Sequence, residues 1–328
     1  MYSIPISRRP ACPIVTTEKK FFEALHRKHG SGHSRQGYVK AKYRFVGNIR
    51  KIFKSISSKL LPGHDPSFMI IGAQKAGTTS LHYYLDQHPK LAGSYPKELN
   101  YFSRDIFLGK DLNWYRKHFT SLTKPDAMFF ESTPKYMNLE PVAQQIAKTY
   151  PNMKFIMILR EPIARAYSGW NMYRSYSPKQ IARKMSGSNG HTRNRVYKYL
   201  FDKRTAFPSF REVVDLELDF ISRCSDEGPF ILRKGLYVDQ IKMYYRYFDA
   251  DQILILAFRD LVTKPNETCN RVLEFLNVNG PACTFNIEPK NQREYPDKIT
   301  GDDKKILEEF YLEPNRELRE LLGRELNW

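Results

Sequence analysis

Residues 70–81 carry the side chains best suited to chemistry in this chain. They read Ile-Ile-Gly-Ala-Gln-Lys-Ala-Gly-Thr-Thr-Ser-Leu, between an apolar run and an apolar helical pattern. This order predicts a strand, a tight loop and a helix N-terminus, where backbone N–H groups and the helix dipole favour an anion. The loop places Lys75 between its glycines and Thr78 after the second one, where an ATPase loop has lysine. We therefore expect a phosphate site of another kind.

The next strong strand ends in a second cation. Residues 154–159 form a continuous apolar run typical of a central parallel strand, and Arg160 follows them. A P-loop nucleotide hydrolase places a magnesium-binding Asp here, whereas Arg160 suits a phosphate. Ser168 lies on the helix expected after Pro162, within reach of the same anion. Two anion sites at the carboxyl edge of a sheet predict a nucleotide with phosphates at both ends of its ribose.

The two motifs together resemble the sulfotransferase superfamily, whose donor is 3′-phosphoadenosine-5′-phosphosulfate (PAPS). They occupy residues 74–80 and 159–168, and the resemblance extends from about residue 67 to residue 328. It is closest to the carbohydrate branch, the heparan sulfate sulfotransferases. It implies a metal-independent enzyme that moves the sulfuryl group of PAPS to a hydroxyl or amine of a carbohydrate or glycolipid. The released product is 3′-phosphoadenosine-5′-phosphate (PAP).

The resemblance assigns the donor site to both motifs. Lys75 would neutralise the bridging oxygen and the leaving 5′-phosphate, an electrostatic role of the kind that usually dominates such transfers. Arg160 and Ser168 would hold the 3′-phosphate, and Arg165 would join them or form a surface ion pair. Arg293 matches the family's lid loop over PAPS, although the glycine of that loop is missing here. The remaining donor-binding residues are Ala76, Gly77, Thr78, Thr79 and Ser80.

Glu98 falls where related carbohydrate sulfotransferases keep their catalytic glutamate. A general base must accept the proton of the acceptor, and we expect Pro96 and the apolar residues after Glu98 to hold its carboxylate in a partly dry cleft. Read without the family, Glu98 is an ordinary surface glutamate. His82 and His118 are rival bases for which structural roles are favoured. The residues expected to bind the acceptor are Lys97, Ser132 and Lys135.

Two departures weaken assignment to one particular acceptor. Ser132 stands where the heparan 3-O enzymes have a lysine, and Asn100 stands where they have a histidine. A small hydroxylated metabolite or a lipid therefore remains an alternative acceptor.

Positive charge is concentrated at the N-terminus. The net charge is +18, and residues 1–64 hold 14 Lys and Arg against 2 Glu, a balance of +12. Such a potential attracts polyanions without choosing among nucleic acid, anionic lipid and acidic polysaccharide; the resemblance favours an acidic glycan and no nucleic acid. Residues 49–61 pattern as a basic amphipathic helix, which packs on the domain or lies on a membrane. Residues 174–204, with nine Lys and Arg against one Asp, predict a basic loop near the site.

Cysteine use and hydropathy bear on the compartment. The four cysteines show neither metal spacing nor a disulfide framework, which predicts free thiols in a reducing compartment. No stretch reaches the roughly 18 apolar residues of a membrane span. Golgi carbohydrate sulfotransferases normally carry an N-terminal anchor. We therefore expect a cytoplasmic enzyme with peripheral membrane contact through residues 49–61, and the Golgi lumen is the alternative.

Strand and helix patterns alternate along the rest of the chain. Strands are expected at 91–95, 127–131 and 252–257, and helices at 137–150, 209–223, 235–248 and 264–276. The alternation predicts one P-loop-type α/β domain over residues 65–328, with a central parallel sheet of about five strands flanked by helices. A basic extension, residues 1–64, precedes it.

Two other functional classes compete with a sulfotransferase. A P-loop nucleotide or small-molecule kinase explains the glycines but not Thr78 in the lysine position or Arg160 in place of a metal-binding Asp. A non-catalytic polyanion-binding protein explains the charge but not the paired phosphate motifs.

Overall fold

The computed structural model describes residues 58, 61–121, 124, 126–186, 191–202, 204–278, 285–287, 295 and 297–328. They belong to one compact unit, residues 54–328. The predicted N-terminal extension lies almost wholly outside the described residues, and only Ser58 and Leu61 of its expected helix are included. Arg293 also lies outside them.

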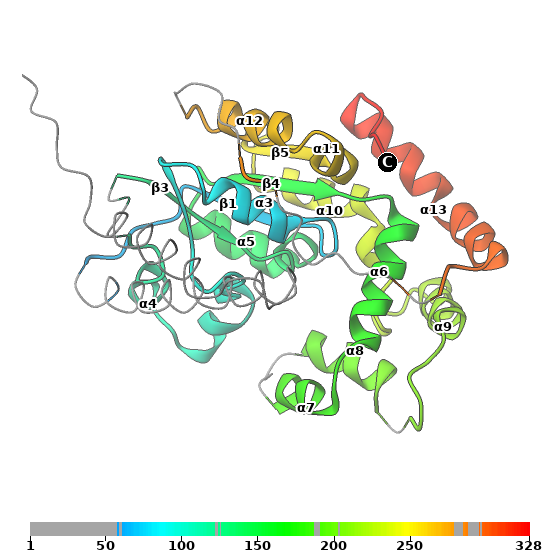
Figure 1. Cartoon of the computed structure of the whole chain (residues 1–328). Helices are drawn as coiled ribbons and strands as arrows, with labels where there is room; N and C mark the ends of the chain where they lie inside the picture. The colour runs from blue at the N-terminus through cyan, green and yellow to red at the C-terminus, as the bar shows by residue number, and fades with distance from the viewer. Residues whose placement is uncertain are drawn as a thin grey trace, which may run out of the picture. The chain divides into compact units, whose positions relative to one another are not determined.

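Five parallel strands form the central sheet, in the order β2-β3-β1-β4-β5 (Figure 1). The strands are β1 (Phe68–Gly72), β2 (Leu91–Gly93), β3 (Met128–Ser132), β4 (Lys154–Leu159) and β5 (Ile253–Ala257). The continuous apolar runs of β1 and β4 are buried along almost their whole length, as expected for central parallel strands. The predicted parallel sheet of about five strands is confirmed.

Helices connect and cover the strands. They are α3 (Thr78–Leu85), α4 (Leu112–Arg116), α5 (Glu140–Thr149), α6 (Pro162–Arg174), α7 (Pro178–Ser186), α8 (His191–Leu200), α9 (Phe210–Ser222), α10 (Tyr237–Tyr245), α11 (Phe258–Thr263), α12 (Pro265–Phe275) and α13 (Gly301–Leu322). Short helical turns are η1 (Tyr101–Asp105), η2 (Ile106–Leu108), η3 (Tyr136–Asn138), η4 (Arg233–Gly235) and η5 (Ala250–Gln252). The sequence patterns therefore located most elements to within a few residues, although they did not predict α13.

The direction of each crossover decides which face a helix covers. The connection through α3 runs from β1 to β2 in one direction along the sheet, and the connection through α5 runs from β3 to β4 in the other. Right-handed crossovers therefore place α3 and α5 on opposite faces. Helix α12 contacts α3, and α10 contacts α5, so each face is covered by a helix pair.

A second apolar cluster lies beside the sheet and joins α6, α8, α9 and α13 (Figure 1). It corrects the expectation that residues 174–204 form a loop, because most of this segment is helical in α7 and α8. Val196 and Leu200 of α8 are buried against this cluster. The abundance of basic residues hid an apolar helix face that only this packing reveals.

Gly72 ends β1 where the sheet meets η3. A Cβ atom at this position would lie 2.3 Å from the Met137 sulfur and 2.6 Å from the Met137 Cβ. Met137 is buried, so it has little room to move. The first glycine of the loop is therefore required by close packing.

Replacing Gly72 by alanine should destabilise the fold. We expect Gly72→Ala to lower the free energy of unfolding by about 1–3 kcal/mol, as overpacked core substitutions do. Urea denaturation measures this change. Gly301→Ala is the control, because a Cβ atom at Gly301 meets nothing within 4 Å. Equal stability of the two variants would contradict the close-packing account.

Candidate functional site

The loop between β1 and α3 is shaped to face an anion. Gly77 caps α3 with φ 83° and ψ 10°, a left-handed conformation, and a Cβ there would lie 3.0 Å from Leu261 and 3.1 Å from Phe258. Lys75 also has a positive φ, 75°. No side chain caps α3, and its first turn holds no acidic residue. The N-terminus of α3, at residues 78–80, thus has the features of helix N-termini that bind anions.

Arg160 joins this loop to the end of β4. Its Nη1 donates to the Lys75 carbonyl at 3.1 Å, and its guanidinium carbon lies 4.9 Å from the centre of the Phe258 ring. The Arg160 carbonyl accepts from the Tyr237 hydroxyl at 2.8 Å. Burial lowers the pKa of Arg160, because its charge is partly removed from water. A partly buried cation held this way is suited to an incoming anion.

Helix α6 places Ser168 near the same edge of the sheet. Glu161 caps α6 by accepting from the N–H groups of Ile163 (2.9 Å) and Ala164 (2.6 Å). Ser168, nearly two turns into the helix, is buried, and its Oγ lies 2.7 Å from the hydroxyl of Tyr295. Tyr295, two residues after Arg293, was not among the residues predicted from the sequence.

Further contacts hold the chain near Tyr295 against α6. The Tyr167 hydroxyl donates to the Asp297 carbonyl at 2.7 Å, and the Arg174 guanidinium pairs with the Asp297 carboxylate at 2.7 Å. Residues 295 and 297 therefore lie over α6, beside Ser168. The lid role expected for the segment around Arg293, which lies outside the described residues, stays a prediction.

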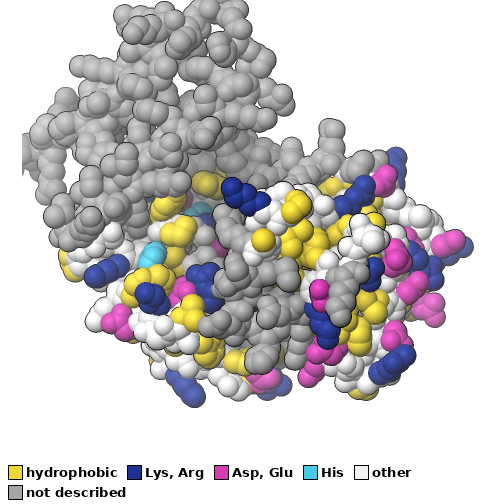
Figure 2. Space-filling view, turned by 90° about the horizontal axis from the view of Figure 1, so that it is seen from below, with side chains coloured by type: hydrophobic (Ala, Val, Ile, Leu, Met, Phe, Trp, Pro, Cys, Tyr) yellow, Lys and Arg dark blue, Asp and Glu magenta, His cyan; other side chains and the backbone are white. Residues whose placement is uncertain are grey.

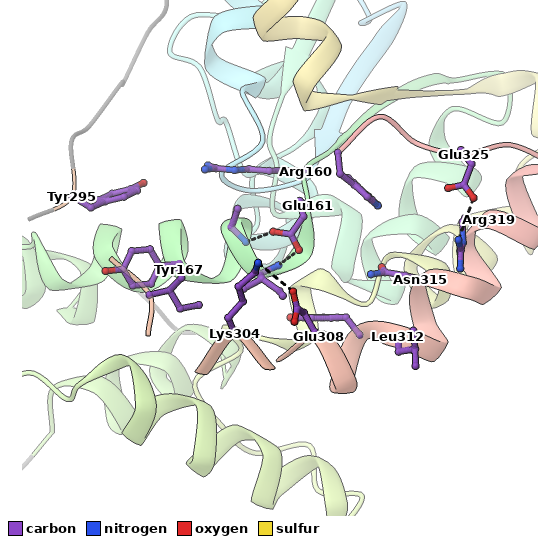
Figure 3. Close-up of a pocket in the computed structure, with 15 residues that line it drawn as sticks. Arg160, Glu161, Tyr167, Tyr295, Lys304, Glu308, Leu312, Asn315, Arg319 and Glu325 are labelled. Carbon is purple, nitrogen blue, oxygen red and sulfur yellow. Dashed lines mark hydrogen bonds and ion pairs between the residues drawn. The ribbon is translucent and has the colours of Figure 1, made fainter. Parts of the chain in front are cut away.

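A pocket of about 710 Å³ adjoins Arg160 and Tyr295. Figure 3 shows the Arg160 side chain pointing toward Tyr295, with α13 forming the opposite wall. Lys304 pairs with Glu308 at 3.3 Å and Arg319 with Glu325 at 3.1 Å. These four charged residues, on and just after α13, thus pair with one another, whereas Arg160 forms no ion pair with the described residues.

Glu98 lies in the segment after β2, and its environment differs from the expected dry cleft. Its side chain is 52% exposed, and one carboxylate oxygen lies 2.8 Å from Lys97 Nζ. The backbone turns sharply here, since Glu98 has φ 65° and its N–H donates to the Ser132 carbonyl at 3.1 Å. Leu99 and Phe102 are buried. The apolar neighbours therefore turn into the core and leave the carboxylate in solvent.

The proposed acceptor-binding residues occupy different environments. Ser132 is fully buried, and its hydroxyl lies 2.7 Å from Nδ1 of His82. Its side chain therefore does not reach the surface, whereas Lys97 and Lys135 are half-buried. His82 and His118 have structural contacts, the latter with the Trp114 carbonyl at 3.0 Å. The structure thus brings Lys97 and Glu98 together and leaves Ser132 beneath them.

A buried carboxylate supports the Glu98 segment from below. Glu131, at the end of β3, accepts from the hydroxyls of Tyr115 (2.5 Å), Thr133 (2.5 Å) and Tyr136 (3.0 Å). The Tyr136 hydroxyl in turn accepts from the N–H of Phe102 at 3.2 Å. Burial raises the pKa of Glu131, although its hydroxyl donors oppose this shift. This network connects the end of β3 to the chain that carries the candidate base.

Residues 65–291 match the family described as sulfotransferase domain. The chain belongs to this family. Among solved structures, a sulfotransferase from Alicyclobacillus acidocaldarius superposes with a TM-score of 0.57 at 23% identity, covering 80% of this chain and 98% of that one. That likeness shows a shared fold.

Three relatives illustrate the range of the family. "Membrane-associated sulfotransferase kil1" of Dictyostelium discoideum is 25% identical, over 80% of this chain and 66% of its own length. Human "Bifunctional heparan sulfate N-deacetylase/N-sulfotransferase 1" is 27% identical, over 78% and 29%. Human "Heparan sulfate glucosamine 3-O-sulfotransferase 5" is 26% identical, over 68% and 56%. The chain thus spans two thirds or less of the length of these relatives.

Two features are absent from the described residues. They contain no group of three or more His, Cys, Asp and Glu side chains arranged to hold a metal ion. None of their helices is long and apolar enough to cross a bilayer. Cys224 is exposed and Cys269 is buried, and neither forms a disulfide among the described residues.

The Glu131 network predicts a pH-dependent stability difference. Because burial raises the pKa of Glu131 above 4.5 in the folded state, the folded protein keeps this proton up to a higher pH than the unfolded chain does. The free energy of unfolding of the wild type should therefore fall, relative to Glu131→Gln, as pH rises above 4.5 toward the folded pKa. Urea denaturation at a series of pH values measures this difference. Glu309→Gln, at an exposed position of α13, should run parallel to the wild type; parallel curves for Glu131→Gln would contradict the prediction.

Proposed function

We propose that this protein transfers the sulfuryl group of PAPS to a hydroxyl or amine of a carbohydrate. The observation that carries the proposal is the 3.1 Å hydrogen bond from Arg160 to the Lys75 carbonyl. It places the cation of the β4 end beside the phosphate-binding loop, so that one nucleotide with separate 5′ and 3′ phosphate groups can contact both. Family membership supports the sulfuryl chemistry.

The residues present fit such a donor. Gly77 allows the close packing and the left-handed turn that open the α3 N-terminus toward a 5′-phosphate. Arg160 and Ser168 supply a cation and a hydroxyl for the 3′-phosphate, and the adjoining pocket of about 710 Å³ leaves space beside them. Residues 76–80 would hold the 5′ end through backbone N–H and hydroxyl groups. PAPS, when bound, supplies a sulfuryl group on a good leaving phosphate.

Glu98 would act as the general base, and Lys75 would stabilise the leaving phosphate. The Glu98 carboxylate accepts the acceptor's proton as the acceptor oxygen or nitrogen forms a bond to sulfur. The bond between sulfur and the bridging oxygen breaks, and its electron pair remains on the 5′-phosphate of PAP. Lys75 and the loop N–H groups neutralise that charge, which is the largest electrostatic demand of the reaction. Lys97 Nζ lies 2.8 Å from the Glu98 carboxylate and would orient it toward the acceptor.

The proposed acceptor is a glycan, with an acidic polysaccharide preferred. Relatives named for heparan sulfate support this choice. The total of +18 less the +12 of residues 1–64 leaves only +6 for residues 65–328. Figure 2 accordingly shows Lys and Arg interspersed with Asp and Glu on the face it presents. Local cations such as Lys97 and Lys135 would therefore bind the acceptor, and residues 49–61 would provide the membrane contact that the name of kil1 suggests.

Calorimetric titration with PAP in the absence of magnesium tests the donor site. Arg160→Met should weaken PAP binding about 10- to 100-fold, because a hydrogen bond to a charged group contributes about 1.5–3 kcal/mol. Adenosine 5′-monophosphate, which lacks the 3′-phosphate, should bind both proteins equally. Tight magnesium-dependent binding of ATP, with little affinity for PAP, would instead support a kinase.

Replacing Glu98 separates an enzyme from a binding protein. Glu98→Gln should lower sulfuryl transfer to heparan sulfate or its N-deacetylated form by about 100-fold or more, the usual contribution of a general base. PAP affinity should stay unchanged, because the carboxylate lies outside the donor-binding loop. Glu267→Gln, at an exposed position of α12, serves as the matched control. Full activity of Glu98→Gln would remove this residue from the mechanism.

A further inference from the structure

Two buried charged side chains hold a short turn at residues 231–234. Arg165 of α6 donates to the Ile231 carbonyl. The Glu217 carboxylate of α9 accepts from the N–H groups of Ile231 (2.6 Å) and Arg233 (2.9 Å). Arg165 is 1% exposed and Glu217 is fully buried. Arg165 is therefore a buried residue of α6 that contacts this turn, which rules out the surface ion pair suggested as an alternative from sequence.

A third helix, α13, also binds the turn at residues 231–234. The buried Tyr311 of α13 donates its hydroxyl to the Leu232 carbonyl at 2.7 Å. A Cβ atom at Gly235 would lie 2.8 Å from the Tyr311 oxygen, so the turn fits against α13 only with glycine at this position. Side chains from α6, α9 and α13 thus bind the backbone of three consecutive residues, Ile231, Leu232 and Arg233, directly before Lys234.

Burying the charges of Arg165 and Glu217 costs free energy, so we expect them to have a specific role. Removing a guanidinium and a carboxylate from water costs several kcal/mol each, which their attraction often fails to recover. In addition, Arg165 Nε has no hydrogen-bond partner in the described part of the chain. A buried polar arrangement of this kind gives geometric precision more reliably than stability. The residue whose position it determines is Lys234.

Lys234 connects this turn to the phosphate-binding loop. Its Nζ donates to the side-chain oxygen of Gln74 at 3.2 Å, and Gln74 directly precedes Lys75. The bond places the Gln74 amide oxygen toward Lys234. The Gln74 amide nitrogen donates no hydrogen bond to the described residues, so its two N–H groups remain available for a ligand.

The charged surroundings of Lys234 come from several elements. Burial and the nearby Arg165 lower the pKa of Lys234 to about 8, and Glu217 opposes that shift. Lys234 also lines a pocket of about 410 Å³. The other charged residues of this pocket are Asp226, Arg233 and Asp239. Cations gathered beside a phosphate-binding loop repel one another, and an anion bound in the loop relieves that repulsion.

We infer that Lys234 is a positioning residue of the sulfuryl-transfer site, which fixes the Gln74 amide so that its N–H groups donate to the sulfuryl oxygens during transfer. This inference rests on the proposed function. The turn held by Arg165, Glu217 and Tyr311 supplies the rigidity that such a role requires, because an oriented donor is effective only when it needs no rearrangement during the reaction.

Transfer kinetics and PAP binding of three variants test the inference. Lys234→Met and Gln74→Leu should each lower kcat by about 100-fold, the typical loss on removing an oriented donor, with PAP affinity nearly unchanged. The double variant should be no slower than either single variant, since both remove the same interaction. Lys242→Met, on the exposed side of α10, is the matched lysine control and should retain full activity.

A pH profile separates positioning from a purely structural role. Because the neutral amine of Lys234 is a weaker donor to Gln74 than the ammonium group, the wild-type kcat/KM, which reports the free enzyme, should fall as pH rises through about 8. Lys234→Arg keeps its charge at all these pH values, so it should retain activity and lose this alkaline decline. If Lys234→Met fails to fold, as shown by thermal melting, the Lys234→Arg profile decides the question.

The outcomes distinguish this inference from the proposed function. A wild-type protein that neither binds PAP nor transfers sulfuryl groups would overturn the proposed function itself. An active wild type with an unaffected Lys234→Met variant, with additive effects of Lys234 and Gln74, or with the same alkaline decline in Lys234→Arg, would overturn the role of Lys234 alone.

Discussion

The hydrogen bond between the Arg160 guanidinium and the Lys75 carbonyl is the interaction on which the site depends. It connects the ends of β1 and β4, two adjacent strands, and so brings the loop proposed for one phosphate beside the cation proposed for another. Because the parallel strands end at the same edge of the sheet, no long insertion is needed to bring these groups together. The close packing of Gly72 and Gly77 against neighbouring side chains then restricts the backbone conformation of the loop.

The candidate catalytic side chains lie at the surface, whereas the side chains that hold their segments in place are buried. The candidate base, Glu98, is half exposed and paired with Lys97, whereas the carboxylate that supports its segment, Glu131, is fully buried among three hydroxyls. An acceptor approaching from solvent can reach the first carboxylate but not the second. The same arrangement recurs on the other side of the loop, where buried Arg165 and Glu217 support the turn that presents Lys234.

Much of the fold was predictable because its signals are local. Apolar runs located the strands, and βα alternation implied a parallel sheet. The C-terminal helix α13 and helices α7 and α8 were missed, because charged and polar residues dominate their sequences. The apolar faces of α8 and α13 become evident only where they pack against α6 and α9. Likewise, the dry environment expected for Glu98 was wrong, since the orientation of one side chain in a turn depends on which of its neighbours the core takes up.

The sequence by itself determined the two candidate anion-binding motifs, their order and the family, since glycine spacing and a strand-end arginine are read within a few residues. Only the tertiary structure decided which residues meet across long separations. Tyr295 beside Ser168, Lys234 beside Gln74 and Glu131 beneath the Glu98 segment are such contacts. They depend on helix packing and side-chain burial, which are properties of the whole folded chain, so no local pattern encodes them.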